Sequence, residues 1–172
     1  EKRVEVIRGL CDPDVDAGIE LDVPGHAPGE SQVHGADPAR AAFGARRAFG
    51  DSLALAHDPD IDIVSVTVKV PEHRAIVLAA LAAGKHVFIE KPLAASTRDA
   101  AELATTAAAQ GLVLMPGHTF LYSPPVVAIH DLIVSGALGD LLFISSSRVN
   151  LGLHQSDVSV VWDLAPHDFS IL

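Results

Sequence analysis

The chain has 172 residues, of which 49% are hydrophobic, and its 12 basic and 22 acidic residues give a formal net charge of -10. This length and composition suffice for the buried core of one globular domain or slightly more. The acidic balance leaves no basic surface to neutralise phosphates, so a nucleic-acid-binding protein is disfavoured and small-molecule chemistry is the default.

The N-terminal part of the chain contains one clear strand pattern. Residues 4–10 combine apolar and charged side chains in a short run, which predicts a strand followed by a carboxylate-rich turn. Residues 17–37 show neither a strand period nor a helix period, which predicts a loop, with at most a weak strand at residues 31–36. Asp37 is a candidate N-cap, and a helix is predicted over residues 39–48.

From residue 51 onward, strand and helix patterns alternate with short connections. Runs of valine and isoleucine indicate strands, whereas apolar residues spaced three and four apart, with caps before and glycines after, indicate helices. This alternation predicts right-handed βαβ units and a parallel sheet, hence an α/β fold. The predicted helices are residues 51–57, 71–83 and 96–110, and the predicted strands are residues 61–70, 86–90 and 112–115.

The character of the sequence changes after residue 118. Two prolines precede a predicted helix, a longer and partly alternating strand is expected next, and a polar loop leads to a final helix. These elements are predicted at residues 126–135, 141–149, 150–161 and 162–172, in that order.

Two groups of polar residues could carry chemistry. Glu90, Lys91 and Pro92 directly follow an apolar strand pattern, and ligands of open α/β sheets collect at the carboxyl ends of strands. Asp163 and His167 are four residues apart, so they share one face of a helix. Each group alone is more often structural: a solvated turn in the first case, an acid beside a satisfied histidine in the second. Together they suit alcohol oxidation, with the histidine as base, the carboxylate orienting it and the lysine holding the oxygen.

A family resemblance connects these groups. Residues 88–93 (Phe-Ile-Glu-Lys-Pro-Leu), residues 162–168 (Trp-Asp-Leu-Ala-Pro-His-Asp) and residues 58–64, 79–85 and 117–122 resemble the glucose–fructose oxidoreductase / inositol dehydrogenase family (Gfo/Idh/MocA). The resemblance implies an incomplete Rossmann-type parallel sheet with the beginning of a C-terminal α+β domain. It implies a dinucleotide-binding domain over residues 1–119 and the start of a substrate domain over residues 120–172.

The resemblance also implies the residues of the site. Lys91 would hold the substrate oxygen beside the nicotinamide, His167 would take the hydroxyl proton, and Asp163 would orient His167. The family often has a cis bond in its Glu-Lys-Pro motif, so the Lys91–Pro92 bond is a candidate for cis. Besides Lys91, cofactor contacts are implied at Thr67, Pro71, His73 and Glu90. Similarity to relatives acting on nucleotide-linked amino sugars suggests substrate contacts at Arg148, Asn150 and His154. An ordinary surface loop fits these residues nearly as well.

The cofactor of the family is NAD or NADP, and the chain departs from the pattern that binds it. Members begin with a strand, a Gly-x-Gly-x-x-Gly turn and a helix whose N-terminus holds the pyrophosphate. This turn is absent, so we expect the chain to start at the second strand of the sheet, whose terminal acid binds the adenosine ribose. Asp12 follows the better strand pattern and is preferred, whereas Asp37 has the better spacing to later elements. No metal site is expected.

The cellular setting follows from cysteine content and hydropathy. The single cysteine, Cys11, excludes an internal disulfide and suits a reducing compartment. The N-terminal residues lack the features of an export signal, and the longest apolar run, residues 76–83, is far shorter than the ~20 residues of a membrane span. We therefore expect a cytoplasmic protein that contacts neither membranes nor nucleic acids.

These observations predict an NAD(P)-dependent oxidoreductase that transfers hydride between nicotinamide and an alcohol of a sugar or nucleotide-linked sugar, working as a homo-oligomer. One alternative is a non-catalytic protein that senses a sugar or dinucleotide, because residues 67–74 are similar to galactose-pathway co-repressors of this fold. Such co-repressors lack the Glu-Lys-Pro lysine, which Lys91 retains here. Another alternative is an inactive fragment, as the missing glycine turn suggests.

Overall fold

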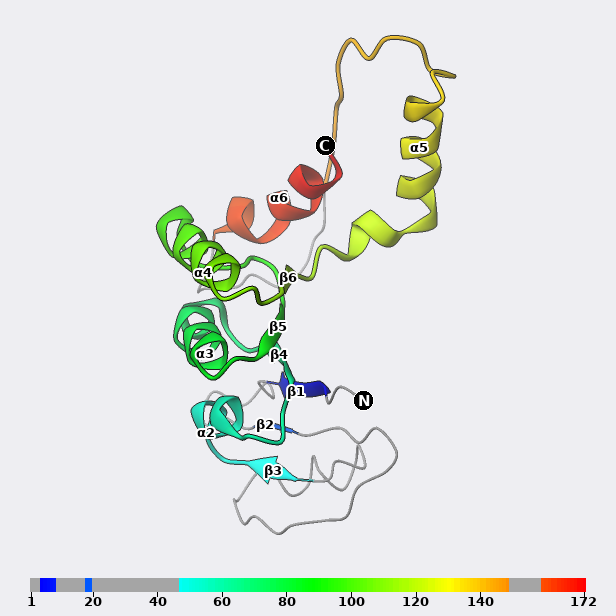
Figure 1. The fold of residues 1–172 in the computed structure, drawn as a ribbon. Coiled ribbons are helices and arrows are strands. Elements are labelled where there is room, and N and C mark those ends of the chain that lie inside the picture. The colour runs from blue at the N-terminus through cyan, green and yellow to red at the C-terminus, as the bar shows by residue number, and fades with distance from the viewer. Residues whose placement is uncertain (1–3, 9–17, 20–46, 149–158) are drawn as a thin grey trace. The chain divides into compact units, whose positions relative to one another are not determined.

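In the computed structural model, the described residues are 4–8, 18–19, 47–148 and 159–172 (Figure 1). The chain divides into two compact units, Glu1–Pro116 and Gly117–Leu172. The sequence placed a domain boundary between residues 119 and 120. The assignment of the two units to cofactor and substrate stays a prediction, and each unit is described by itself.

The first unit contains a six-stranded sheet in the order β3-β2-β1-β4-β5-β6. Two short strands at one edge are antiparallel to their neighbours, β2 (Gly18–Ile19) and β3 (Ala48–Phe49). The other four strands pair in parallel, namely β1 (Val4–Arg8), β4 (Ile63–Thr67), β5 (His86–Ile89) and β6 (Leu114–Pro116). The predicted α/β fold with a Rossmann-type parallel sheet is therefore confirmed.

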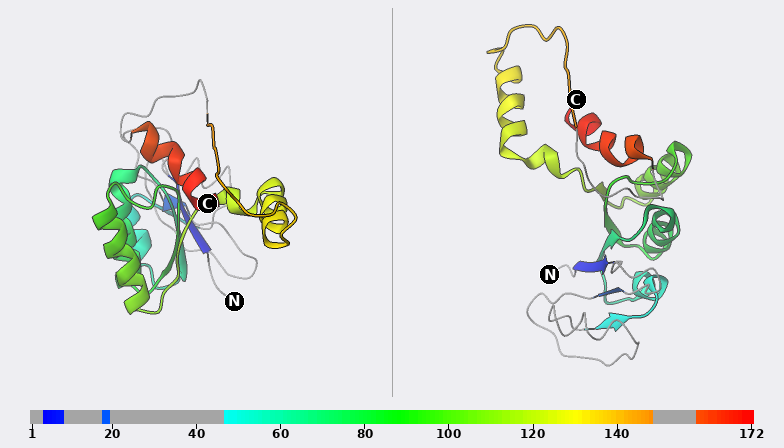
Figure 2. Two further views of the ribbon diagram at one scale, coloured as in Figure 1. Left: turned by 90° about the horizontal axis from the view of Figure 1, so that it is seen from above. Right: turned by 180° about the vertical axis from the view of Figure 1, so that it is seen from behind.

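Three helices lie side by side on one face of this sheet, and the middle one contacts both of the others (Figures 1 and 2). They are α2 (Ser52–His57), α3 (Val70–Ala82) and α4 (Thr97–Ala109). Side-chain caps hold the starts of two of these helices: the Asp51 carboxylate accepts from the Leu53 amide at 3.0 Å, and the Ser96 hydroxyl accepts from the Asp99 amide at 3.1 Å. Gly84 and Gly111 end α3 and α4 with φ of +76° and +65°, which other residues rarely adopt.

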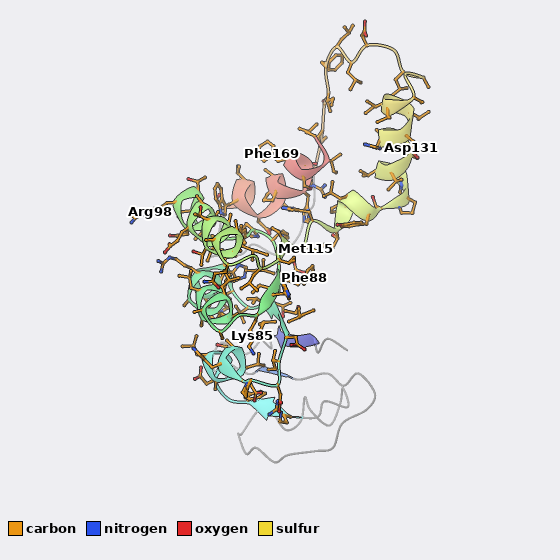
Figure 3. All side chains as sticks on the ribbon, in the orientation of Figure 1. Lys85, Phe88, Arg98, Met115, Asp131 and Phe169 are labelled. Atoms are coloured by element: carbon orange, nitrogen blue, oxygen red, sulfur yellow. The ribbon has the colours of Figure 1, made fainter. Side chains whose placement is uncertain are left out.

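The core lies between this helical layer and the sheet. Alternate residues of neighbouring strands point toward the helices and are fully buried, including Val64, Val66, Val87 and Ile89. On the opposite face, Phe88 is half-buried and Met115 is 40% exposed, and Figure 3 shows both on the side away from α3 and α4. Among the described residues of this unit, no helix covers that face.

The position of β1 differs from one prediction. β1 pairs in parallel with β4, from Val4 opposite Ile63 to Arg8 opposite Thr67. In the Rossmann order 3-2-1-4-5-6, the strand between the second and the fourth is the first. β1 thus takes the place of the first strand of that order, whereas the sequence predicts that the chain starts at the second, and the assignment of this strand within the family stays a prediction. The antiparallel direction of β2 also has a simple reason, since residues 9–17 are too few for the crossover of a dozen or more residues that a parallel return needs.

Two further predictions near the N-terminus had different outcomes. The predicted helix over residues 39–48 does not reach its predicted end, because Ala48 belongs to β3 and pairs with Ile19. Pairing with a neighbouring strand overrides the helix propensity of alanine there. The rest of that helix and the weak strand at residues 31–36 lie outside the described residues.

The second unit consists of a short 3₁₀ helix, η1 (Thr119–Tyr122), followed by α5 (Pro124–Val134) and α6 (Val160–Ile171). Both α-helices confirm their predictions. The predicted strand over residues 141–149 is wrong, because residues 141–148 form neither helix nor strand and residue 149 lies outside the described residues. A strand needs a hydrogen-bonded neighbour, and the described part of this unit contains no second strand.

Candidate active site

The Lys91 segment leaves the sheet where two parallel strands end together. β5 pairs with β4 up to Ile89, and the Glu90 amide extends the ladder by donating to the Val66 carbonyl at 2.9 Å. The Lys91 amide then donates to the Glu90 carboxylate at 3.3 Å, and the Lys91–Pro92 peptide bond is cis, as predicted. Pro92 is buried and Lys91 is half-buried. The predicted lysine thus lies at the carboxyl edge of the sheet, where open α/β sheets bind ligands.

The other predicted cofactor residues of this unit gather at the same edge. Thr67 is the last residue of β4, and Pro71 is in the first turn of α3. Thr67 and Glu90 are half-buried, whereas Pro71 is exposed. The structure therefore brings Thr67, Pro71, Glu90 and Lys91 to one end of two neighbouring strands, and their contacts with a cofactor stay predictions.

His73, also predicted to contact the cofactor, lies inside the protein. The residue is 1% exposed. Its Nδ1 atom lies 3.1 Å from the Pro92 carbonyl oxygen, and its Nε2 atom lies 3.1 Å from that of Val68. Both ring nitrogens therefore face carbonyl groups of the protein itself, and an indirect role suits this placement better than a direct one. The sequence held a signal for this burial, since His73 is spaced three and four residues from the buried Ile76 and Val77.

The predicted base and its carboxylate lie on α6 of the second unit. Asp163 and His167 are four residues apart on this helix, so they share one face as predicted. Both are half-buried, and the Ser159 hydroxyl caps the helix by accepting from the Trp162 amide at 3.2 Å. A carboxylate beside an imidazole can orient the ring and stabilise its protonated form. The catalytic roles of the two residues stay predictions.

Sequence reasoning missed the contact of His167 with Phe120 and the contacts of Arg148 with Phe120 and Asp168. The Phe120 ring meets the His167 ring edge to face, with centroids 4.8 Å apart and planes at 80°. The guanidinium carbon of Arg148 lies 4.7 Å from the Phe120 centroid. Arg148 also donates two hydrogen bonds of 3.3 Å to the carboxylate of Asp168. Only the position of Asp168 next to His167 in the sequence hinted at this group, because Phe120 and Arg148 are far away in the chain.

The environment of Asp168 favours its ionised form. The hydrogen bonds from Arg148 and Ser146 lower the pKa of this carboxyl, and the charges of Arg148 and His167 act in the same direction, against the opposing effect of desolvation. The Ser146 hydroxyl donates to the carboxylate at 2.8 Å. Arg148, predicted to contact substrate, is thus engaged with Asp168 and Phe120 within its own unit.

Several predicted residues lie outside the described residues: Asp12, Asp37, Asn150 and His154. The placement of β1 weakens the reason for preferring Asp12 as the ribose acid, because that preference assumed that its strand was the second. Within the described residues, no group of three or more His, Cys, Asp or Glu could hold a metal ion. In the same part of the chain, no helix is long and apolar enough to span a membrane.

Comparison with known proteins relates this geometry to one family. Residues 27–118 match an oxidoreductase family with an NAD-binding Rossmann fold. The chain is 40% identical over 98 residues to trans-1,2-dihydrobenzene-1,2-diol dehydrogenase of Oryctolagus cuniculus, covering 57% of this chain and 30% of that protein. It is 39% identical over 94 residues to dTDP-3,4-didehydro-2,6-dideoxy-alpha-D-glucose 3-reductase of Streptomyces violaceoruber, covering 55% of this chain and 28% of that protein.

A solved structure shows the same likeness. The 3-ketoreductase KijD10 from Actinomadura kijaniata, a mutant in complex with TDP-benzene and NADP, is 32% identical with a TM-score of 0.55. The match covers 61% of this chain and 32% of that one. The chain therefore spans about a third of the length of the relatives it matches.

Proposed function

The chain belongs to the Gfo/Idh/MocA family of oxidoreductases with an NAD-binding Rossmann fold, and on that premise we propose that it acts as an NAD(P)-dependent oxidoreductase. Its substrate would be an alcohol or ketone of a sugar or nucleotide-linked sugar. The observation that carries the proposal is the position of Lys91, which follows β5 at the carboxyl edge of the parallel sheet within the residues that match the family.

Each predicted catalytic residue has one task in this proposal. Lys91 binds the oxygen of the reacting carbon, because an ammonium group stabilises the negative charge that develops there. His167 takes the hydroxyl proton during oxidation and returns it during reduction, as suits a group that titrates near neutral pH. Asp163, one helical turn before His167, keeps the imidazole oriented. The nicotinamide, when bound, accepts or supplies the hydride.

The residues present fit one half of the cofactor better than the other. Thr67, Pro71, Glu90 and Lys91 lie at the edge where a nicotinamide would bind. β1 holds the position of the first strand, after which the family has its glycine-rich turn. Residues 9–14 contain a single glycine and two aspartates, which supply neither the close approach nor the charge that a pyrophosphate needs. Binding of the cofactor pyrophosphate is therefore the part of the proposal that the residues present support least.

The substrate class follows from the relatives. One acts as a reductase on a dTDP-linked deoxysugar and another was solved with a TDP compound and NADP, by their names. The residues suggested to contact the sugar, Arg148, Asn150 and His154, stay part of the proposal. Arg148 would have to exchange its contact with Asp168 for a substrate group, so it is the least favoured of the three.

The test begins with binding and continues with turnover. Calorimetric titration of the full chain with NADH and NADPH, followed by assays on sugars and dTDP-sugars, should detect both cofactor binding and reduction of a keto group. Lys91→Met is expected to lower kcat/KM about 100- to 1,000-fold, the usual loss for one positioned electrostatic group. Arg98→Met, at an exposed residue of α4, removes the same charge and is the matched control (Figure 3). Equal activity in wild type and Lys91→Met would refute the assignment.

A second candidate function is sugar sensing without catalysis. The lack of a Gly-x-Gly-x-x-Gly pattern after β1 favours it, because a protein that binds sugar alone has no need of a pyrophosphate turn. Calorimetry distinguishes the two: a sugar that binds while neither dinucleotide binds at millimolar concentration supports the sensor, and turnover with either dinucleotide excludes it.

A further inference from the structure

His73 joins the two chain segments that leave β4 and β5. It lies in the first turn of α3, and its side chain is almost completely buried. Val68 directly follows β4, and Pro92 and Leu93 belong to the segment that follows β5. The imidazole therefore lies between the end of one strand and the segment that carries Lys91.

The hydrogen-bond geometry of the ring is two-sided. Nδ1 lies 3.1 Å from the carbonyl oxygen of Pro92 and 3.4 Å from that of Leu93. Nε2 lies 3.1 Å from the carbonyl oxygen of Val68 on the opposite side of the ring. Carbonyl oxygens only accept hydrogen bonds, so each ring nitrogen must carry a proton to bond its own side. A neutral ring bonds one of the two segments, and a doubly protonated ring bonds both.

The neighbouring buried residues of α3 are aliphatic, and a buried polar group is costly unless its hydrogen bonds are made. The imidazole instead lies between the carbonyl groups of two segments. Pro92 and Leu93 belong to the segment of Lys91, and Val68 directly follows β4. Residues predicted to contact the nicotinamide lie close to both in the chain. The ring thus lies where hydrogen bonds on its two sides would fix the distance between these two segments.

We propose that His73 is a positioning residue that holds residues 90–93, and with them Lys91, against the end of β4. It acts through Lys91 and the β4 segment and touches neither substrate nor cofactor. The contact exists whether or not the chain is an enzyme, but its consequence for catalysis rests on the proposed function. Misplacement of a catalytic group by about 1 Å costs about 100-fold in turnover.

Three substitutions separate the two sides of the ring. His73→Asn keeps an amide donor at the position of Nδ1, toward Pro92 and Leu93. His73→Gln reaches the position of Nε2, toward Val68, and His73→Leu removes both donors. His57→Asn is the control, because His57 is exposed and its Nδ1 atom contacts only the Leu53 carbonyl of its own helix among the contacts described, at 2.7 Å.

The first measurement, amide hydrogen exchange, does not depend on catalytic turnover. Residue-resolved amide exchange in the full chain compares Lys91 and Leu93 with Val68 and Lys69, and Ile76 in α3 serves as internal reference. His73→Leu should speed exchange about tenfold in both groups relative to the reference, the factor expected for one ordinary hydrogen bond. His73→Asn should do so only at Val68 and Lys69, and His73→Gln only at Lys91 and Leu93. Uniform acceleration, or none, overturns the proposal.

The second readout uses turnover if the wild-type chain has it. His73→Leu should lower kcat about 100-fold with little change in KM for the sugar, and one of the two amide variants should restore most of the loss. Unchanged kcat in His73→Leu overturns the positioning role. If the wild-type chain shows no turnover, the proposed function fails for this chain, and the exchange pattern alone decides whether His73 holds the segment.

Discussion

The segment that carries Lys91 and the helix that carries His167 are held in place by different means. Lys91 follows a strand whose inward-facing residues, Val87 and Ile89, are 1% and 0% exposed, and backbone hydrogen bonds and the buried His73 hold the turn after it. His167 lies on a half-buried helix, where its ring contacts the Phe120 ring, and Phe120 and Asp168 are in turn held by the Arg148 side chain. The first arrangement depends on the core of its unit, and the second depends on a few exchangeable side chains.

The two units also differ in how far their side chains are buried. The first unit has a contiguous buried core built from two strands and three helices. In the second unit, none of the described residues of α5 is buried, and Leu142 and Phe143 are 91% and 83% exposed. Substitutions should therefore lower the free energy of unfolding more in the first unit than in the second.

Matched leucine substitutions give the largest expected contrast. Leu81→Ala empties a fully buried site on α3 and should lower the free energy of unfolding of the first unit by about 2–5 kcal/mol. Leu132→Ala, on α5 with 45% exposure, should change stability by less than about 0.5 kcal/mol. Urea unfolding followed by circular dichroism measures both. The one tryptophan of the chain, Trp162, lies in the second unit, so its fluorescence shows whether the units unfold together. Equal effects of the two substitutions would contradict the comparison.

Removing the buried ammonium of Lys85 should have the next largest effect on stability. Its Nζ atom donates to the carbonyl groups of Asp58 and Ile61 at 2.8 and 2.5 Å, which closes the turn between α2 and β4 (Figure 3). Lys85→Met keeps the aliphatic stem but removes both hydrogen bonds, and the Asp58 carbonyl keeps only the Ile61 amide at 3.3 Å, at a cost of about 1–3 kcal/mol. The same urea titration measures it, with Lys69→Met at an exposed lysine as control. A neutral result for Lys85→Met would show that water replaces the ammonium.

A helix cap should have a smaller effect. The Ser96 hydroxyl accepts from the Asp99 amide and donates to the Asp99 carboxylate at 2.7 Å, so both residues hold the start of α4. Ser96→Ala should cost about 1 kcal/mol, and Ser96→Gly only about a few tenths of a kcal/mol, because glycine is tolerated at N-caps. Thermal unfolding followed by circular dichroism resolves a change of this size. A cost above that of Lys85→Met would reverse the expected order.

The contact between Arg148 and Asp168 should be visible mainly through its pH dependence. The folded state lowers the pKa of Asp168 through its hydrogen bonds with Arg148 and Ser146. A depressed folded pKa means that the contact stabilises the second unit above the unfolded value of about 3.9 and that this stabilisation disappears as the pH falls through the lower folded value. Asp168→Asn should therefore differ from wild type in Trp162 fluorescence unfolding at pH 7, and the difference should shrink below about pH 4. A difference that is independent of pH would exclude the ionic contact as its cause.

Arg148→Met provides the partner test for that contact. If the contact acts as a unit, the effects of Arg148→Met and Asp168→Asn at pH 7 should not add in the double variant. Additive effects would show that each side chain stabilises the unit separately, through Phe120 in the case of Arg148.

Local sequence signals determined much of the regular structure. The helices α2, α3 and α4 begin and end near the residues that caps, prolines and glycines indicated, because these signals act within a single turn. The spacing of Asp163 and His167 placed both on one helical face for the same reason. The cis bond before Pro92 came from the family motif in the sequence.

Other features depended on partners far away in the chain. β1 is central because it pairs with β4, and its sequence alone suggested a different strand of the sheet. Residues 141–148 begin with an apolar run and resemble a strand, yet strand structure requires a neighbour that the described part of their unit lacks. His73 and Arg148 were read as ligand contacts, whereas carbonyl groups of two separate loops surround the first, and Asp168 and Phe120 engage the second. Sequence determined which residue types were present and how they repeat, and the tertiary structure decided which groups meet, since hydrogen bonds and burial act between segments that the chain order does not bring together.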